Sequence, residues 1–231
     1  MNIISLSAPI AGNACAVALY IKSYIYNYNR ETNFFDFLVC SIKSINDVIT
    51  NKKIEVGQII SNDIFCSILF KNFDLLISHH DLEVDNENNI EKINNVVEKY
   101  QRRQERLFNY IKNSNKIFFI RYCDKTENIE KNEITNFYKN IKNINNKLLF
   151  YFILITNNND LIVPKELFSK KNFLFINLNK HSNDNIIDKD INPFFQIIES
   201  YKPLTNIIYD KLNNIEKINL KNKSKKIINS F

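Results

Sequence analysis

Glycine is scarce in this chain of 231 residues: only Gly12 and Gly57 occur, and tryptophan is absent. Glycine-rich loops bind phosphate through closely spaced main-chain N–H groups, yet neither a P-loop nor a GxGxxG pattern occurs. The GxSxG, HExxH and EF-hand patterns are missing as well. These absences argue against a standard nucleotide-binding enzyme, and we expect no cofactor.

Cysteine is also scarce, and its spacing is informative. Cys15, Cys40, Cys66 and Cys123 lie far apart, without a CxxC pair or a Cys/His cluster of zinc-site spacing. We therefore expect no metal site, no disulfide framework, and a reducing, cytoplasmic location. The first 21 residues carry no charged side chain, which leaves export open. Turn residues interrupt this stretch, however, so it resembles neither a signal peptide nor a transmembrane segment.

The chain is basic, with a formal net charge of +6 and a pI of about 9.0. Much of the excess lies in the last residues, "KINLKNKSKKIINSF". A basic tail can attract nucleic acid or an anionic membrane, but interleaved aromatic and arginine side chains are missing here. We expect a single α/β domain over residues 1–215, a basic and mobile tail over 216–231, and no nucleic-acid partner.

Apolar runs alternate with amphipathic stretches, most clearly in the second half. The sequence predicts strands at 2–6, 116–122, 147–156 and 172–178, and helices after Asn13 and at 89–113, 129–144 and 194–212. Continuous apolar strands alternating with helices are typical of a parallel sheet that is covered on both faces. We expect a three-layer α/β fold with a mostly parallel sheet and an irregular region at about 34–82.

Cys15 is the first candidate for chemistry. Asn13 can cap the helix that follows the "SAPIAGN" loop, which places Cys15 in the first turn. There the helix dipole and free N–H groups would stabilise a thiolate and could form an oxyanion hole. The alternative is that Cys15 is a small buried apolar residue.

"HHD", residues 79–81, supplies a candidate base and acid. A histidine beside a cysteine can act as a general base, and an acidic side chain such as Asp81 can orient it. The only other histidine is His181, so the choice is narrow. The alternative is an exposed polar turn, or a helix cap made by Asp81.

Arginines gather in "YQRRQERL" as Arg102, Arg103 and Arg106, and Arg121 ends a predicted strand. The first three could bind phosphate or carboxylate, or they could form salt bridges along their own helix. Arg121 could neutralise an anionic ligand, or it could pair with Asp36 or Asp81. In open parallel sheets the site lies at the carboxyl ends of the strands, so Arg121 and the loop before Cys15 should converge if their strands are neighbours.

The order of these pieces resembles a family described as "putative papain-like cysteine peptidase". The matching segments are "ISLS…NAC", "FFDFL", "SHHDL", "YQRRQERL" and "FFIRY". Ser7 stands where that family has glycine, Phe37 replaces its tryptophan, and the loop before Cys15 is longer. The resemblance implies that Cys15 is the nucleophile and His80 the base, with Asp81 or Asp36 orienting the imidazole.

The combined prediction is a cysteine hydrolase, peptidase-like or acyl-transferring, that acts on a peptide or glycan-linked substrate. The predicted substrate-binding residues are Asn13, Asp36, Arg103 and Arg121. A glycan-modifying α/β enzyme and a non-catalytic binding module with a basic surface are the two alternatives.

Overall fold

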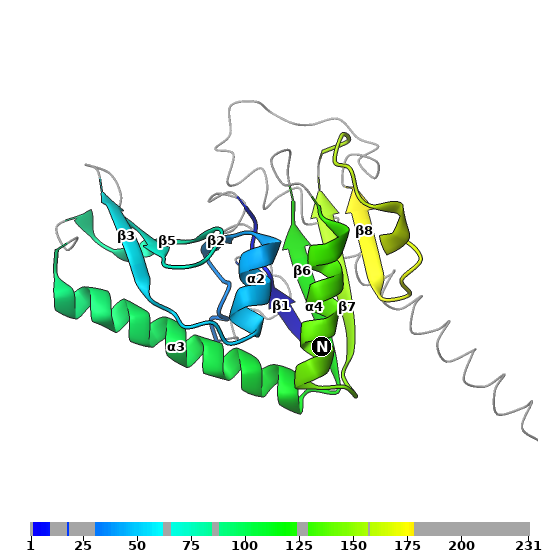
Figure 1. Cartoon of the computed structure of the whole chain (residues 1–231), viewed down its shortest axis with the longest axis horizontal. Coiled ribbons are helices and arrows are strands. Elements are labelled where there is room, and N and C mark those ends of the chain that lie inside the picture. Colours follow the sequence, from blue (N-terminus) through cyan, green and yellow to red (C-terminus); the bar gives the residue numbers. More distant parts are fainter. Residues whose placement is uncertain are drawn as a thin grey trace, which may run out of the picture.

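Two four-stranded sheets lie side by side in the computed structural model of the chain (Figure 1). The structure describes residues 2–9, 18, 31–61, 66–84, 88–123, 129–156 and 158–177. One sheet has the strand order β1-β6-β7-β8 and the other has the order β2-β5-β4-β3. The predicted helix at 194–212 and the predicted basic tail lie outside the described residues.

The first sheet is parallel throughout, as predicted. Its strands are β1 (Ile3–Ser5), β6 (Lys116–Tyr122), β7 (Leu149–Thr156) and β8 (Phe173–Asn177). Helix α4 (Lys131–Ile144) packs on it through Phe137, whose ring meets Phe119 of β6 edge-on at 5.1 Å and Phe152 of β7 at 5.1 Å. Burying each such ring contributes about 1.5–3 kcal/mol. The turn before β8 holds a short 3-10 helix, η3 (Lys165–Leu167).

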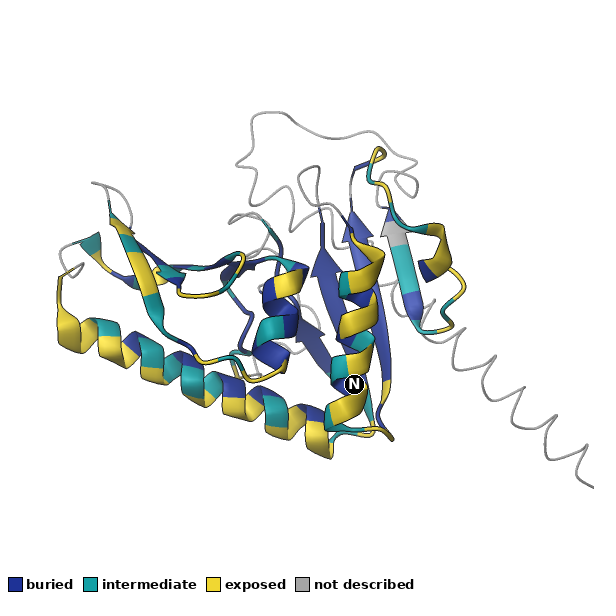
Figure 2. Cartoon of the chain, viewed as in Figure 1, coloured by how far each residue is buried: buried dark blue, intermediate teal, exposed yellow. Residues whose placement is uncertain are grey.

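Both faces of the central strands β6 and β7 are buried (Figure 2). Phe119 and Phe150 face α4, whereas Phe118 and Tyr151 stack on each other at 5.2 Å on the opposite face. This burial explains why the two strands read as continuous apolar runs. The three-layer arrangement stays a prediction, because the expected helices after Asn13 and at 194–212 lie outside the described ranges.

The prediction of an irregular region at 34–82 is wrong, because these residues build the second, antiparallel sheet. The elements are β2 (Leu38–Cys40), α2 (Ile42–Ile49), β3 (Val56–Ser61), β4 (Cys66–Phe70) and β5 (Leu76–Leu82). The strand β2 has only three residues, and register shifts interrupt the β3–β4 and β4–β5 pairings. Short, bulged strands lack the strict alternation by which a strand is recognised in sequence.

Helix α3 (Ile90–Asn113) lies along the antiparallel sheet and continues toward the base of the parallel one (Figure 1). Its buried side chains follow helical spacing, with Val96, Tyr100, Leu107 and Ile111 turned inward. The buried Gln104 donates to the carbonyls at the end of α2, Val48 O at 3.0 Å and Lys52 O at 3.2 Å. No helix within the described ranges is both long and apolar enough to cross a membrane.

Candidate functional site

The carboxyl end of β1 is where the two sheets meet. Leu6 donates its main-chain N–H to Ile120 O of β6 at 2.7 Å, and Ala8 forms a parallel bridge with Val39 of β2. Residues 6–8 therefore lie between a strand of the parallel sheet and a strand of the antiparallel sheet. Strand β6 neighbours β1, which is the condition under which Arg121 and the loop before Cys15 were predicted to converge. The chain that leads to Cys15 leaves from this junction.

Ser7 holds an unusual backbone conformation at the junction. Its φ is 62°, in the left-handed region that L-residues rarely adopt and glycine adopts without a steric penalty. The side chain is fully buried, its hydroxyl donates to Leu38 O, and its N–H donates to Ser5 Oγ at 3.1 Å. This φ explains in physical terms why a glycine suits this position in the family that the chain resembles.

Arg121 lies inside the same junction, without any exposed surface. Its Nη1 donates to Leu6 O at 2.9 Å and its Nη2 donates to Cys40 O at 2.9 Å. One guanidinium on β6 thus holds the end of β1 and the end of β2 together. Contact with a substrate, which is one of the predicted roles, would need an exposed surface, and Arg121 has none.

His80 is exposed on β5, and its ring lies edge-on to Phe37 with 6.4 Å between centroids. Phe37 has a φ of 66°, which is costly for a bulky side chain. Such strain persists only where the surroundings enforce it, and it is common at active sites. The aromatic residue at position 37 thereby contacts the predicted base.

His79 has a different environment from its neighbour. Its ring is half-buried, and its Nδ1 lies 2.6 Å from Ser67 Oγ of β4. Burial lowers the pKa of His79, and repulsion from His80 lowers it further. Between the two histidines, His80 presents the more accessible imidazole.

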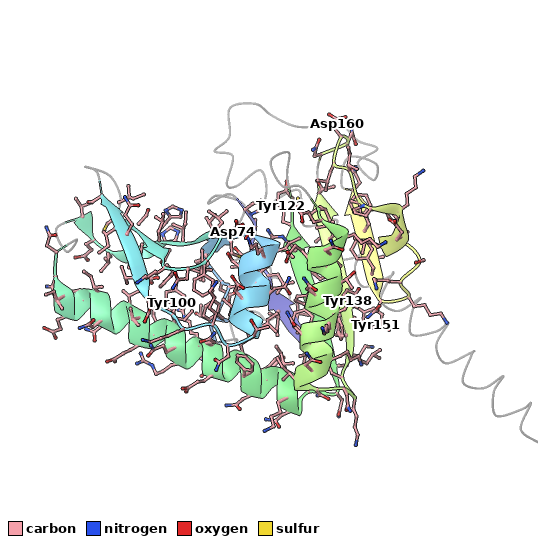
Figure 3. All side chains as sticks on the ribbon, in the orientation of Figure 1. Asp74, Tyr100, Tyr122, Tyr138, Tyr151 and Asp160 are labelled. Carbon is pink, nitrogen blue, oxygen red and sulfur yellow. The ribbon has the colours of Figure 1, made fainter. Side chains whose placement is uncertain are left out.

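Three side chains bond to the Asp81 carboxylate, and the irregular register of β5 brings Asp81 within their reach. The register of β5 shifts between Ser78 and Leu82, so Ser78 and Asp81 both reach α3. Asp81 Oδ2 accepts a hydrogen bond from Tyr100 Oη at 2.6 Å and another from Ser78 Oγ. Lys99 Nζ donates to Oδ1 of the same carboxylate. Figure 3 shows Tyr100 on the side of α3 that is turned toward the antiparallel sheet.

Burial shifts the two α3 side chains that contact Asp81. It lowers the pKa of Lys99 to about 8, and repulsion from Arg103 adds to the shift even though the Asp81 carboxylate lies against the ammonium. Burial also raises the pKa of the Tyr100 hydroxyl. Tyr100 therefore stays a neutral donor to Asp81 at physiological pH.

Asp36 lies near the same tyrosine, so the structure brings both predicted acidic residues to Tyr100. The charge of Asp36 contributes to the raised pKa of Tyr100. Asp36 is buried, and its Oδ2 accepts the Asn33 N–H at 2.6 Å. Asn33 in turn donates its side-chain amide to Ser5 O of β1 at 3.3 Å. The loop before β2 is thereby anchored to β1.

The three arginines of α3 have separate environments. Arg102 pairs with Glu98 at 3.6 Å, which is the intrahelical salt bridge of the alternative interpretation. The Arg103 guanidinium lies over the Tyr100 ring, 5.2 Å from its centroid. Arg106 reaches the chain before β2 and donates to Glu31 at 3.1 Å and to Thr32 O at 3.0 Å.

A cavity of about 600 Å³ lies between α3 and β1, and Arg103 and Arg106 both line it. The other lining residues are Ile3, Ile4, Glu31, Thr32, Asn33, Leu107, Asn109, Tyr110, Asn113 and Ser114. Its volume is in the range of small-molecule sites in proteins. Of the predicted substrate-binding residues that the structure describes, Arg103 is the one that lines this cavity.

The described cysteines are buried, with almost no exposed surface; they are Cys40, Cys66 and Cys123. Within the described ranges, no group of three or more His, Cys, Asp or Glu side chains is placed to hold a metal ion. The predicted nucleophile Cys15 and the predicted Asn13 lie outside the described residues.

The sequence did not reveal Ser78, Lys99 or Tyr100 as partners of Asp81. A signal for Tyr100 was present, since it opens the arginine motif and is a buried-face residue with a hydroxyl. Buried tyrosine hydroxyls usually find a partner. Ser78 and Lys99 carried no such signal, because their contacts depend on the irregular register of β5.

Of three comparisons with known proteins, one finds a match. Neither the curated proteins nor the solved structures contain a match to the chain. The model of a protein family described as "Putative papain-like cysteine peptidase (DUF1796)" matches residues 2–160. This range holds Cys15, His80, Asp81, the arginine helix and Arg121. The match extends over more than half of the sequence, and the chain belongs to this family.

Proposed function

We propose that the protein is a cysteine hydrolase in which Cys15 is the nucleophile and His80 is the general base. The Cys15 thiol gives its proton to His80, and the thiolate sulfur forms a bond to the acyl carbon of the substrate. The imidazolium then protonates the leaving amine or alcohol as its bond to the acyl carbon breaks. Water, deprotonated by His80, hydrolyses the resulting thioester and releases the acid and the free thiol.

The observation that carries this proposal is the combination on β5 of an exposed imidazole and a carboxylate held from several sides. His80 is accessible, and Phe37 lies edge-on to its ring. Asp81 follows directly, with hydrogen bonds from Ser78 and Tyr100. Nucleophilic catalysis by a thiol requires an oriented base, and Phe37 is the neighbour that contacts the His80 ring.

The pairing of strands at the junction of the two sheets is a second observation that favours His80 as the partner of Cys15 in this proposal. The chain toward Cys15 leaves β1 after Ser7, whose hydroxyl is bonded to Leu38 of β2. Leu38 pairs with Ser78 of β5, two residues before His80. A short path through paired strands thus joins the start of the Cys15 segment to the predicted base.

We assign the predicted substrate-binding residues to two roles. Arg103 lines the cavity beside α3 and is available to a ligand. Arg121 and Asp36 are buried and bonded to neighbouring loops and strands, so we assign them to positioning the site. Asn13 is proposed to cap the helix that carries Cys15 and to direct its N–H groups toward the oxyanion.

Reaction with p-nitrophenyl acetate tests the proposal without knowledge of the natural substrate. We expect a burst of p-nitrophenolate and an acetyl group on Cys15, located by peptide mass spectrometry. The Cys15→Ser variant should lack the rapid burst, and His80→Ala should slow acetylation by about 100-fold or more, the usual contribution of a general base.

The His79→Gln variant is the matched control, because it alters the adjacent imidazole on the same strand. It should keep most of the burst. Loss of the burst in His79→Gln but not in His80→Ala would show that His79, and not His80, is the base. If Cys15 gains no acetyl group in the folded protein, the hydrolase proposal fails, and a glycan-modifying enzyme or a binding module becomes the better account.

A further inference from the structure

We propose that the cavity between α3 and β1 binds an amphipathic anion, a small molecule with an apolar body and one carboxylate or phosphate group. The inference deepens the proposed function by giving Arg103 a ligand class, and it rests on that function only for the view that this ligand is the substrate. The binding itself requires neither Cys15 nor His80.

The apolar body of the ligand is specified by the floor of the cavity. Ile3 and Ile4 of β1 and Leu107 of α3 line it, and each has 2–3% of its surface exposed. A volume of about 600 Å³ accepts a chain or ring of several carbon atoms together with a head group. Apolar contact within the cavity would add to the affinity that the charged group provides.

The anionic group is specified by Arg103. Its guanidinium lies over the Tyr100 ring, 5.2 Å from the centroid, and a side-chain hydrogen bond to Tyr100 uses part of its five N–H donors. The planar fork of an arginine matches the two oxygens of a carboxylate or a phosphate. Because the Tyr100 hydroxyl is bonded to Asp81, Arg103 links the cavity to the hydrogen-bond network of that carboxylate.

Arg106 provides a second observation, because a carboxylate of the chain itself already binds there. Glu31 accepts from Arg106 Nη1 at 3.1 Å at the edge of the cavity, and the Glu31 side chain is 79% exposed. The Glu31 carboxylate thus already occupies part of the Arg106 guanidinium at this edge. Glu31 would compete with a ligand for Arg106, and removing its charge should strengthen binding.

The polar wall completes the site. Asn109 and Asn113 lie one helical turn apart on α3, and Ser114 follows at its end. Amide and hydroxyl groups can donate to or accept from further polar atoms of a ligand. The ligand class therefore extends to amphipathic anions with a polar substituent beside the charged group.

Isothermal titration calorimetry on the full-length Cys15→Ser variant tests the inference independently of catalysis. The probes are octanoate, octyl phosphate, octan-1-ol and inorganic phosphate. Saturable binding of octanoate or octyl phosphate is expected, at least tenfold tighter than that of octan-1-ol or inorganic phosphate. The ratio between the first two probes assigns the head group to a carboxylate or to a phosphate.

Three substitutions locate the site. Arg103→Gln should weaken binding of the charged probe about tenfold, the usual effect of losing one charge-assisted hydrogen bond. Glu31→Gln should strengthen binding, and a gain of affinity cannot be attributed to misfolding. Arg102→Gln is the matched control, since Arg102 lies on the same helix and is not among the residues that line the cavity.

The inference is overturned if neither charged probe binds saturably, if octan-1-ol binds as tightly as octanoate, or if Arg102→Gln weakens binding as much as Arg103→Gln. Binding to the Cys15→Ser variant without any acetylation of Cys15 in the native protein would keep this inference and remove the hydrolase proposal. Acetylation of Cys15 without binding of the probes would do the reverse.

Discussion

Ser7 combines a left-handed backbone with a buried hydrogen bond, and the two effects can be separated by substitution. Ser7→Ala keeps the left-handed φ of 62° and removes the bond to Leu38 O, so it should lower the free energy of unfolding by about 1–2 kcal/mol. Ser7→Gly removes the same bond but relieves the strain, so it should cost about 1 kcal/mol less than Ser7→Ala.

Urea denaturation followed by circular dichroism measures both variants of Ser7. The expected order, in which glycine is the more stable variant, is the reverse of the order found at ordinary strand positions. A Ser7→Ala protein as stable as the Ser7→Gly protein would show that the conformation at this junction costs nothing.

Arg121 holds two strands through main-chain carbonyls, so replacing it should lower the free energy of unfolding. Arg121→Met leaves Leu6 O and Cys40 O without these donors, and each buried unsatisfied group costs about 1–3 kcal/mol. Arg121→Lys should be intermediate, because one ammonium cannot reproduce the planar fork.

The midpoint of urea unfolding measures the Arg121 variants, with Lys139→Met on the exposed face of α4 as the control. The control should change the free energy of unfolding by less than about 0.5 kcal/mol. An Arg121→Met protein that matches this control would refute the bracing role.

At the scale of elements, the irregular register of β5 brings Asp81 to helix α3, where its Oδ2 accepts a hydrogen bond from Tyr100 Oη at 2.6 Å. A double-mutant cycle of Tyr100→Phe and Asp81→Asn should give a coupling energy of about 0.5–3 kcal/mol, as for residues in one hydrogen-bond network. The free energies come from urea denaturation of the two single variants and the double variant.

Tyr110→Phe is the matched control for this cycle, because it removes the same hydroxyl on the same helix about 15 Å further along its axis. Its effect should add to that of Asp81→Asn within about 0.5 kcal/mol. Equal coupling for Tyr110 and Tyr100 would mean that the cycle reports a general loosening of α3 rather than the contact.

The strands of the parallel sheet and the helices that follow β5 and β6 could be predicted from the sequence, and the antiparallel sheet could not. Helix 90–113 and the strands 116–122 and 149–156 carry patterns that are complete within one segment. The three residues of β2 are ordered by partners far away in the chain, Ala8 and β5. Pairing of this kind leaves no local pattern, and therefore the antiparallel sheet was missed.

For the candidate site, the residue types could be predicted from the sequence, but their contacts could not. The residue types His80, Asp81 and Arg103 stood out because they are scarce or form motifs. The contacts that give them a role come from other elements: Phe37 at His80, Tyr100 at Asp81, and the β1 floor beside Arg103. A sequence names the chemistry of such groups, whereas the register of the strands decides which of them meet.

At the scale of the whole molecule, His79 should make stability depend on pH. Burial places the pKa of His79 in the folded protein below its ordinary value of about 6.5. Below that pH the unfolded chain binds more protons than the folded one, so the free energy of unfolding falls as the pH drops below about 6.5. Above this pH, the contribution of His79 to the free energy of unfolding is fully present.

Urea midpoints at pH 7.5 and at pH 5.5 measure this dependence, since ordinary carboxylates stay ionised over this interval. The native protein should lose more stability over the interval than His79→Gln. His79→Asn is a second variant that should behave as His79→Gln does, because both lack the imidazole. An identical loss in the native protein and His79→Gln would contradict the assignment.

The account as a whole depends on a thiolate at Cys15 that is activated by His80. The most direct measurement is the pH dependence of iodoacetamide alkylation, resolved for each cysteine by peptide mass spectrometry on the folded protein. Cys40, Cys66 and Cys123 are buried and should label only on unfolding, so they report the integrity of the fold. A fast reaction of Cys15 alone would therefore reflect exposure as well as activation, and the comparison with His80→Ala separates the two.

The account predicts that Cys15 reacts rapidly below pH 7 in the native protein. In His80→Ala, the pH at which Cys15 becomes reactive should rise toward the ordinary thiol pKa of about 8.5. A Cys15 whose alkylation follows an ordinary thiol pKa in both proteins, or that does not react in the folded state, would contradict it.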